Sequence, residues 1–238
     1  MNPTLTIARR ELNSFFDSLV AYIILIAFLG FSGFFTWLYG GDVFLRKQAD
    51  LAVFFNIAYW TLFFFIPALT MKMLAEEKKT GTIELLLTKA VSNRQVVLGK
   101  FLACLAMVCI ALLFTLPYYI TVANIGNIDH GATLSGYLAL LLMSAAYIAI
   151  GLFTSSITNN QIVAFLLALF IGIFFHFIFG ALASGMSGMI GKFLSGLSLS
   201  NHFSSMIRGV IDSKDLIYFL SLTALALFMA EQVVAKRA

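Results

Sequence analysis

Long apolar stretches alternate with short polar stretches along the whole chain. Each apolar stretch has about the 20 residues that a helix needs to cross a bilayer core about 30 Å thick. We therefore predict an all-α membrane protein with six transmembrane helices, at about residues 19–39, 51–71, 101–122, 134–153, 162–182 and 216–234. An even number of crossings places both termini on the same side of the membrane. The whole chain, residues 1–238, then forms a single transmembrane domain.

A further helix is predicted before the first crossing, over residues 2–17. Asn2 suits the N-cap position and Pro3 the first helical position. Apolar positions recur at helical spacing on one face, which contains Leu5, Ala8, Leu12, Phe15, Phe16 and Leu19. Such an amphipathic helix would lie in the membrane interface, and its remaining positions include Arg9, Arg10, Asn13 and Asp17. The alternative is a simple basic flank of the first crossing.

The connection between the last two crossings, residues 183–215, is rich in glycine and still apolar. It is too short for two further crossings and too apolar for a solvated loop. We therefore predict short outer helices that dip back toward the membrane as a re-entrant segment. Its glycines include Gly185, Gly188, Gly191, Gly196 and Gly209. The uncharged polar stretch at 154–161, in contrast, is expected to be a simple connection between two crossings.

The composition agrees with a membrane protein. Hydrophobic residues make up 61% of the chain and charged residues 11%, against about 45–50% and about 25% in soluble domains, which excludes a soluble enzyme and a disordered chain. Of the 15 Lys and Arg residues, ten lie on the side of the predicted termini and five on the other. This excess predicts that both termini are cytoplasmic. The basic residues are not interleaved with aromatic ones, so no nucleic-acid partner is expected.

The most charged part of the chain follows the second crossing, at residues 76–92. A charged run from Glu76 to Lys79 leaves the membrane, and Gly81 can adopt the backbone conformation of a turn. Ile83, Leu86 and Leu87 then form an apolar stripe at helical spacing. Ser92 and Gln95 have the spacing of a capping box that starts the third crossing. The stripe either docks in a groove of a cytoplasmic protein or folds back on the bilayer, and the residues alone leave both open.

Two prolines and one histidine inside the crossings are candidate functional residues. Pro67 and Pro117 each remove a backbone hydrogen bond and can kink a helix; a hinge and static packing are equally compatible with this. His176 is an ionisable residue within the fifth crossing. With no second His, Cys or carboxylate within helical reach, we expect a neutral histidine that is hydrogen-bonded between helices. His130 and His202 are expected to be ordinary residues of outer loops.

Enzyme activity is not expected from this chain. A serine hydrolase would have to be built in a glycine-rich segment with no carboxylate nearby, from Ser184, Ser187, Ser195 and His202. Residues 188–193 have the wrong spacing for a phosphate-binding loop and end in Phe, so ATP hydrolysis would require a separate protein. Cys104 and Cys109 do not face each other on a helix, and neither a disulfide nor a metal site is predicted.

The residues around the charged segment are similar to those of a known family. The run Glu76-Glu77-Lys78-Lys79-Thr80-Gly81-Thr82-Ile83-Glu84-Leu85-Leu86-Leu87-Thr88, with Val91-Ser92 and Leu98-Gly99-Lys100, resembles the ABC-2 type of ATP-binding-cassette transporter permeases. Within that family the chain looks most like the gliding-motility-associated permease subunit, which its N-terminal run from Arg10 to Phe16 also resembles. Ala90 departs from the family pattern, which usually has proline there, and we expect this to loosen the turn.

The resemblance implies that residues 76–92 are a coupling segment that docks on an ATPase. Glu76, Glu77 and Glu84 would contact basic groups of the ATPase, and Leu85, Leu86 and Leu87 would fill its cleft. The implied coupling residues are Glu76, Glu77, Gly81, Thr82, Ile83, Glu84, Leu85, Leu86, Leu87 and Thr88. The N-terminal helix would be the family's interfacial connector helix, with Arg9, Arg10, Leu12, Phe15 and Phe16.

The implied function is that of a permease subunit in the inner (cytoplasmic) membrane of a bacterium. An ATPase subunit dimer would bind ATP and Mg, and its hydrolysis of ATP would drive export, in support of gliding motility. A second permease copy or a related permease, and an auxiliary subunit with a large outer domain, would complete the assembly within the lipid bilayer. The alternative is a non-transporting scaffold or mechanical coupler on the same ATPase. Few polar residues lie in the crossings, which favours a narrow or apolar path.

Overall fold

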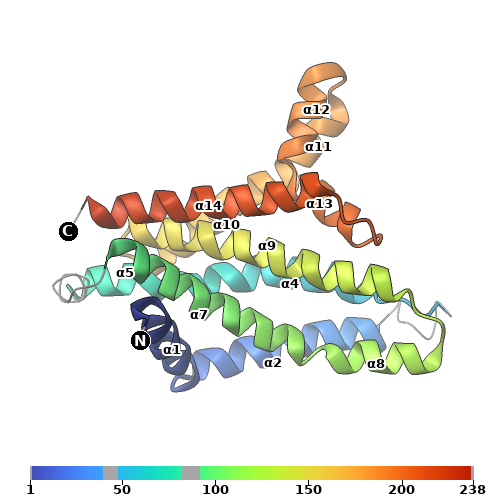
Figure 1. The fold of residues 1–238 in the computed structure, drawn as a ribbon, viewed down its shortest axis with the longest axis horizontal. Helices are drawn as coiled ribbons and strands as arrows, with labels where there is room; N and C mark the ends of the chain where they lie inside the picture. Colours follow the sequence, from blue (N-terminus) through green and yellow to red (C-terminus); the bar gives the residue numbers. More distant parts are fainter. Residues whose placement is uncertain (1, 40–47, 82–91, 237–238) are drawn as a thin grey trace.

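The computed structural model describes residues 2–39, 48–81 and 92–236, and this part of the chain contains helices and no strand. Its long helices run side by side along one axis and form an elongated bundle (Figure 1). The all-α fold class expected from the apolar stretches is therefore confirmed.

Helices lie at each predicted crossing. They are α2 (Leu19–Trp37), α4 (Ala52–Thr70), α7 (Asn93–Leu113) with α8 (Leu116–Ile125), α9 (His130–Ile157), α10 (Gln161–Ile173) and α14 (Ser213–Ala235). In the described residues, five helical stretches are long and apolar enough to cross a membrane. A sixth is added if α1 (Pro3–Phe16) and the following helix, which are bent by 73°, count as one crossing.

Both prolines of the crossings lie near helix breaks. Pro67 is buried inside α4, which ends at Thr70 and continues through Met71 into α5 (Lys72–Lys79). Pro117 was expected inside a helix, but the structure places it elsewhere. Helix α7 ends at Leu113, and Pro117 lies in the first turn of α8. An N–H in a first turn has no intrahelical acceptor, so proline costs little there. Whether either residue acts as a hinge stays a prediction.

Short helices occupy part of residues 183–215, as predicted, although the first of them begins within the predicted fifth crossing; the outer, re-entrant position of the segment stays a prediction. α10 passes through one π-helical turn, η1 (Phe174–Ile178), into α11 (Phe179–Gly185), and α12 (Gly188–Leu197) and α13 (Leu199–Met206) follow. α11 and α12 project from the side of the bundle, whereas α13 returns to it (Figure 1). Gly188 has a φ of +79°, a value that residues with a Cβ rarely adopt, at the turn between α11 and α12.

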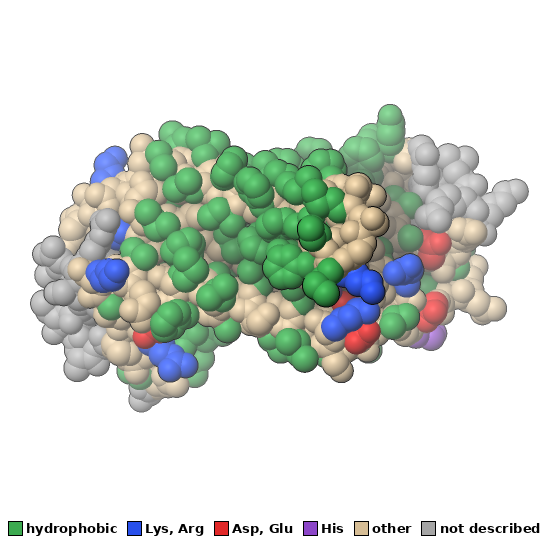
Figure 2. Space-filling view, turned by 90° about the horizontal axis from the view of Figure 1, so that it is seen from above, with side chains coloured by type: hydrophobic (Ala, Val, Ile, Leu, Met, Phe, Trp, Pro, Cys, Tyr) green, Lys and Arg blue, Asp and Glu red, His purple; other side chains and the backbone are tan. Residues whose placement is uncertain are grey.

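The centre of the bundle is α9, which is more enclosed than α10 or α14. It packs against α14, α4 and α10, and small residues bring it close to its neighbours: a Cβ on Gly136 would collide with Phe55, and one on Gly151 with Thr70. Hydrophobic side chains cover the middle of the face in Figure 2, and charged side chains gather toward its two ends. That distribution matches a bundle whose middle lies in lipid.

Helix α1 and the C-terminal end of α14 lie at the same end of the bundle (Figure 1). We call this end the terminal end. It also holds α5 and the first residues of α7. This arrangement agrees with an even number of crossings.

Candidate functional site

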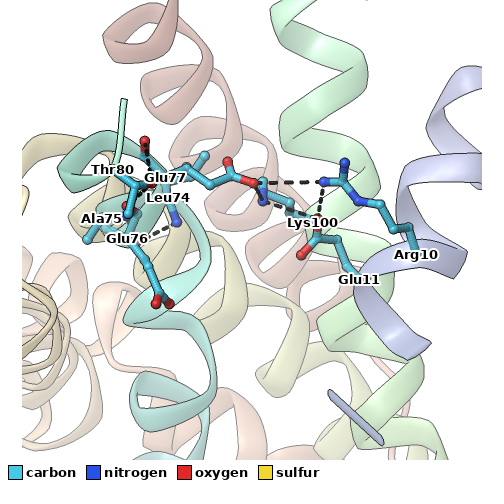
Figure 3. Close-up of polar contacts among 9 residues, drawn as sticks. Arg10, Glu11, Leu74, Ala75, Glu76, Glu77, Thr80 and Lys100 are labelled. Carbon is cyan, nitrogen blue, oxygen red and sulfur yellow. Dashed lines mark hydrogen bonds and ion pairs between the residues drawn. The ribbon is translucent and has the colours of Figure 1, made fainter. Parts of the chain in front are cut away.

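The described part of the coupling segment is its base, where α5 ends. Glu76 is exposed and Glu77 is turned inward (Figure 3). Gly81 has a φ of +71° with open space around it, so the predicted turn at this glycine is confirmed. The other predicted coupling residues lie outside the described residues, and these are Thr82, Ile83, Glu84, Leu85, Leu86, Leu87 and Thr88.

Four charged side chains from three helices meet at this base (Figure 3). The Lys100 Nζ atom of α7 lies 2.7 Å from Glu77 Oε1 of α5 and 3.4 Å from Glu11 Oε1 of α1. Arg10 Nη2 lies 2.5 Å from Glu11 Oε1 and 3.8 Å from Glu77 Oε1. We call Arg10, Glu11, Glu77 and Lys100 the charge cluster.

The charge cluster is important for the structure because its lysine is buried. The Lys100 side chain is only 1% exposed, and a buried ammonium is tolerated only when carboxylates compensate the lost hydration. The cluster contains two cations and two anions, so its formal charges balance. Burial on its own raises the pKa of Glu11, but the positive charges of Lys100 and Arg10 outweigh it and hold that pKa below its usual value. Glu11 is therefore ionised at neutral pH, as the pairing requires.

Close packing of α1 on α7 brings Glu11 to Lys100. A Cβ on Gly99 would lie 2.7 Å from Ile7 Cγ2 and 3.0 Å from the Thr4 carbonyl oxygen, so only glycine fits there. Ile7 and Phe15 are the buried residues of α1. The predicted apolar face was thus partly wrong: Ile7 and Glu11 face the bundle, whereas Leu5 is 60% exposed. The predicted helix itself, with its Asn2 cap and Pro3, is confirmed.

A second contact fixes the start of α5. No side chain of α5 caps its own first turn, and the Ser155 Oγ atom of α9 instead accepts hydrogen bonds from Leu74 N and Ala75 N, both at 3.0 Å. The same hydroxyl donates to the Met71 carbonyl oxygen at 2.9 Å. Ser155 thus supplies from a distant helix the acceptor that a helix N-terminus needs.

The polar stretch at 154–161 is therefore not the simple connection that we expected. Helix α9 continues through Ile157, and Thr154, Ser155 and Ser156 are all fully buried. Short polar side chains can satisfy themselves inside a helix, as Ser156 does by donating to the Phe153 carbonyl oxygen at 2.6 Å. Lys78 also donates to the Ser156 carbonyl oxygen.

The far end of the coupling segment is fixed by a capping box, as predicted. Gln95 N donates to Ser92 Oγ at 3.3 Å, and Ser92 N donates to Gln95 Oε1 at 3.0 Å. Ser92 is the N-cap of α7, the helix that carries Lys100. The described ends of the coupling segment thus belong to α5 and α7, two of the three helices that the charge cluster joins.

The other predicted interfacial residues have different surroundings. Phe15 is 2% exposed, and the Lys72 Nζ atom lies 5.4 Å from the centre of its ring, a cation–π contact between α1 and the start of α5. Leu12 and Phe16 are partly buried against the core. Arg9 is exposed and belongs to no ion pair within the residues that the structure describes.

His176 lies at the π-helical turn and is buried between helices. Its Nδ1 atom is 2.6 Å from the Tyr147 hydroxyl of α9, and its ring stacks on Tyr59 of α4 at 4.0 Å. The expected hydrogen bond of this histidine between helices is confirmed. Its surroundings are aromatic, including Trp60 and Phe63, and provide no acid or base.

His202 is not the loop residue that we expected, and it does have a carboxylate partner. It lies in α13, with Nδ1 2.6 Å from Asp215 Oδ1 and Nε2 2.9 Å from the Gly196 carbonyl oxygen. Both ring nitrogens are thus engaged, which leaves neither free to activate a serine. The pair joins α13 to α14. His130 is the first residue of α9, and its Nδ1 lies 2.8 Å from the Tyr119 hydroxyl.

The geometry defines a class of protein: a multi-pass helical membrane protein whose charged inter-helix segment is attached at both ends to the bundle. Comparison with known families agrees, because residues 6–235 match the model of the ABC-2 family transporter proteins. The match covers nearly the whole chain, so the protein belongs to the ABC-2 transporter family and is a membrane permease subunit. No curated protein matches the chain.

Proposed function

We propose that the chain is the permease subunit of an ABC-2 transporter, and that residues 76–92 couple it to a separate ATPase dimer that binds ATP and Mg. The observation that carries the proposal is the charge cluster. A loop that only connected two helices would not require a lysine that is 1% exposed at its base. A segment that transmits force does require a rigid attachment.

The charge cluster and Ser155 determine which helices the coupling segment is attached to. Movement of the coupling segment acts on α5 through Glu77, on α7 through Lys100 and on α1 through Glu11. Ser155 adds α9, the central helix. A push by the ATPase would therefore reach four helices at the terminal end.

The proposed substrate path is apolar and lies between two permease copies. Several polar residues of the crossings are buried within a single bundle, and these are Ser32, Thr115, Ser144 and Tyr147. The surface between the charged ends is largely apolar in the face that Figure 2 shows. Such a surface suits a hydrophobic, lipid-linked or extended substrate better than a small hydrophilic solute.

The remaining details of the proposal rest on the resemblance of residues 76–100. They are the location in the bacterial inner membrane, export, gliding motility and an auxiliary subunit with an outer domain. The neighbouring reading frames test them. An ATPase gene and a gene for a subunit with a large outer domain beside this one are expected, and their absence would contradict the gliding-type assembly.

The docking role is tested by co-purification with the cognate ATPase. Glu84→Arg and Leu86→Asp are expected to abolish the association, because they reverse a charge and remove an apolar contact in the proposed docking surface. Asp17→Arg is the matched control: it reverses an exposed charge next to α1 and is expected to leave the association unchanged. Membrane insertion, read from a C-terminal fluorescent fusion, should be equal for all variants. Association of both docking variants at the wild-type level would overturn the proposal.

A further inference from the structure

A groove between α7 and α14 opens at the terminal end. It has a volume of about 410 Å³ and is lined by Arg94, Val97, Leu98, Ala224, Leu227, Phe228 and Glu231. The α7 residues and the α14 residues are each spaced at helical intervals, so one face of each helix forms a wall. The groove is separate from the charge cluster, to which none of its lining residues belongs.

The lining changes from charged to apolar along the groove. Arg94 is the second residue of α7, and Glu231 is near the end of α14, so both charges lie at the mouth of the groove. Val97 and Leu98 lie about one turn farther into the bundle, as do Leu227 and Phe228. Ala224 lies about two turns in, and its small side chain leaves the inner part of the groove open.

The two opposite charges do not pair with each other. Arg94 and Glu231 line the same groove, yet no ion pair or hydrogen bond of either side chain is found in the described residues. A ligand that neutralises both charges would stabilise two unpaired opposite charges in a groove of low polarity. A zwitterion between them would do so.

We propose that this groove binds one phosphatidylethanolamine molecule of the adjacent leaflet. Its phosphate pairs with the Arg94 guanidinium, which offers donors in a fixed fork. Its primary ammonium donates hydrogen bonds to the Glu231 carboxylate, which a quaternary choline group cannot do. One acyl chain lies along the apolar walls formed by Leu98, Leu227 and Phe228, which are at least partly exposed, whereas Val97 is buried behind them. The lipid thus fills the seam between α7 and α14.

The test is native mass spectrometry of the purified full-length chain. The protein is stripped of lipid in detergent and titrated separately with the phosphatidylethanolamine, phosphatidylcholine and phosphatidylglycerol of one acyl composition. We expect one phosphatidylethanolamine per chain, bound at least about tenfold more tightly than the other two lipids. Binding of the three lipids with equal affinity would overturn the proposal.

Three variants assign the binding to the groove. Glu231→Gln should abolish the preference for phosphatidylethanolamine over phosphatidylcholine, since both retain a phosphate for Arg94. Arg94→Gln should weaken both lipids. Ala224→Trp should weaken both lipids by filling the apolar part without altering a charge, which separates the groove from general surface electrostatics. Arg9→Gln removes an exposed arginine at the same end and is the control, with wild-type binding expected.

Other occupants give different results. If a second copy of the chain covers the groove, a single cysteine introduced at position 98 or at position 224 will cross-link one copy to the other, and lipid selectivity will not respond to Glu231→Gln; that outcome would overturn the proposal. Equal circular dichroism spectra ensure that the variants are folded. Failure of this site would not affect the ATPase-docking proposal, which concerns residues 76–92 and is read by co-purification.

Discussion

At the scale of single residues, Lys100 has the most demanding position in the protein. Taking an ammonium group out of water costs several kcal/mol. The Lys100 side chain is only 1% exposed, so it bears almost the full cost of this desolvation. The ion pairs with Glu77 and Glu11 offset that cost only when α5 and α1 are both packed against α7. A single side chain thus makes the positions of three helices depend on one another.

Replacing Lys100 by methionine keeps the volume of the side chain and removes its charge. Of the two cations of the charge cluster, Glu11 and Glu77 then retain Arg10, whose side chain is 53% exposed and lies 3.8 Å from Glu77. Breaking a buried pair on one side costs about 3–5 kcal/mol, and we expect a loss of that size in the free energy of unfolding. Thermal unfolding in detergent measures it. Lys79→Met, at an exposed position of α5, is the control, and equal losses in both variants would contradict a special role for Lys100.

Glu11 gives the charge cluster a pH dependence. Its pKa in the folded protein lies below the usual 4.5, so the unfolded chain binds a proton more readily than the folded one. The stabilisation is therefore complete above the unfolded pKa and is lost as the pH falls through the lower folded pKa. Glu11→Gln should unfold at a lower temperature than the wild type at pH 7, and the difference should shrink below about pH 4. A difference that does not vary with pH would contradict the pairing.

At the scale of elements, α1 is held by shape as well as by charge. Ile7 occupies the space above Gly99, where a Cβ would lie 2.7 Å from its Cγ2 atom. Helix α1 is thereby fixed against α7 at the level of Lys100. If α1 were only a membrane-surface helix, the residue at position 99 would not need to be glycine.

Gly99→Ala is expected to push α1 away from α7 and to cost about 1–3 kcal/mol by overpacking. Ile7→Ala in the same chain should recover part of the loss, because it removes the colliding Cγ2 atom but leaves Ile7 Cβ, 2.8 Å from the added Cβ. Gly30→Ala is the control: nothing lies within 4 Å of its Cβ position, and helix propensity alone would stabilise it by about 0.5–1 kcal/mol. Thermal unfolding and proteolysis of α1 report both effects. If the double variant is no more stable than Gly99→Ala, the proposed collision is wrong.

The elements that could be predicted are those encoded locally. The apolar runs predicted the crossings. The three-residue spacing of Ser92 and Gln95 predicted where α7 begins. The contacts that build the site join residues far apart in the chain: Ser155 and Leu74 are separated by 81 residues. No local pattern distinguishes a serine that caps a distant helix from a serine in a connecting turn. For the same reason Asp215, in the next helix, was not recognised as the partner of His202.

At the scale of the whole molecule, the bundle has two chemically different ends. The terminal end holds α1, the end of α5, the start of α7 and the end of α14 (Figure 1). Of the 15 Lys and Arg residues, the ten on the side of the termini flank these elements in the sequence. The positive-inside rule therefore applies to the same end of the bundle that the ATPase would have to reach.

This gives a prediction for the orientation of the bundle in the membrane. A protease that cuts after Lys and Arg, added outside spheroplasts, should cleave near Arg46 or Lys192 and spare Lys78. In inverted vesicles the pattern should be reversed, with cleavage at Lys78 or Lys79, because the terminal end then faces the protease. Peptide mass spectrometry identifies the cut sites, and detergent-solubilised protein shows which bonds are intrinsically cleavable. Cleavage at Lys78 from outside would invert the orientation and remove the coupling segment from the reach of any cytoplasmic ATPase, so this result would refute the coupling proposal together with the topology.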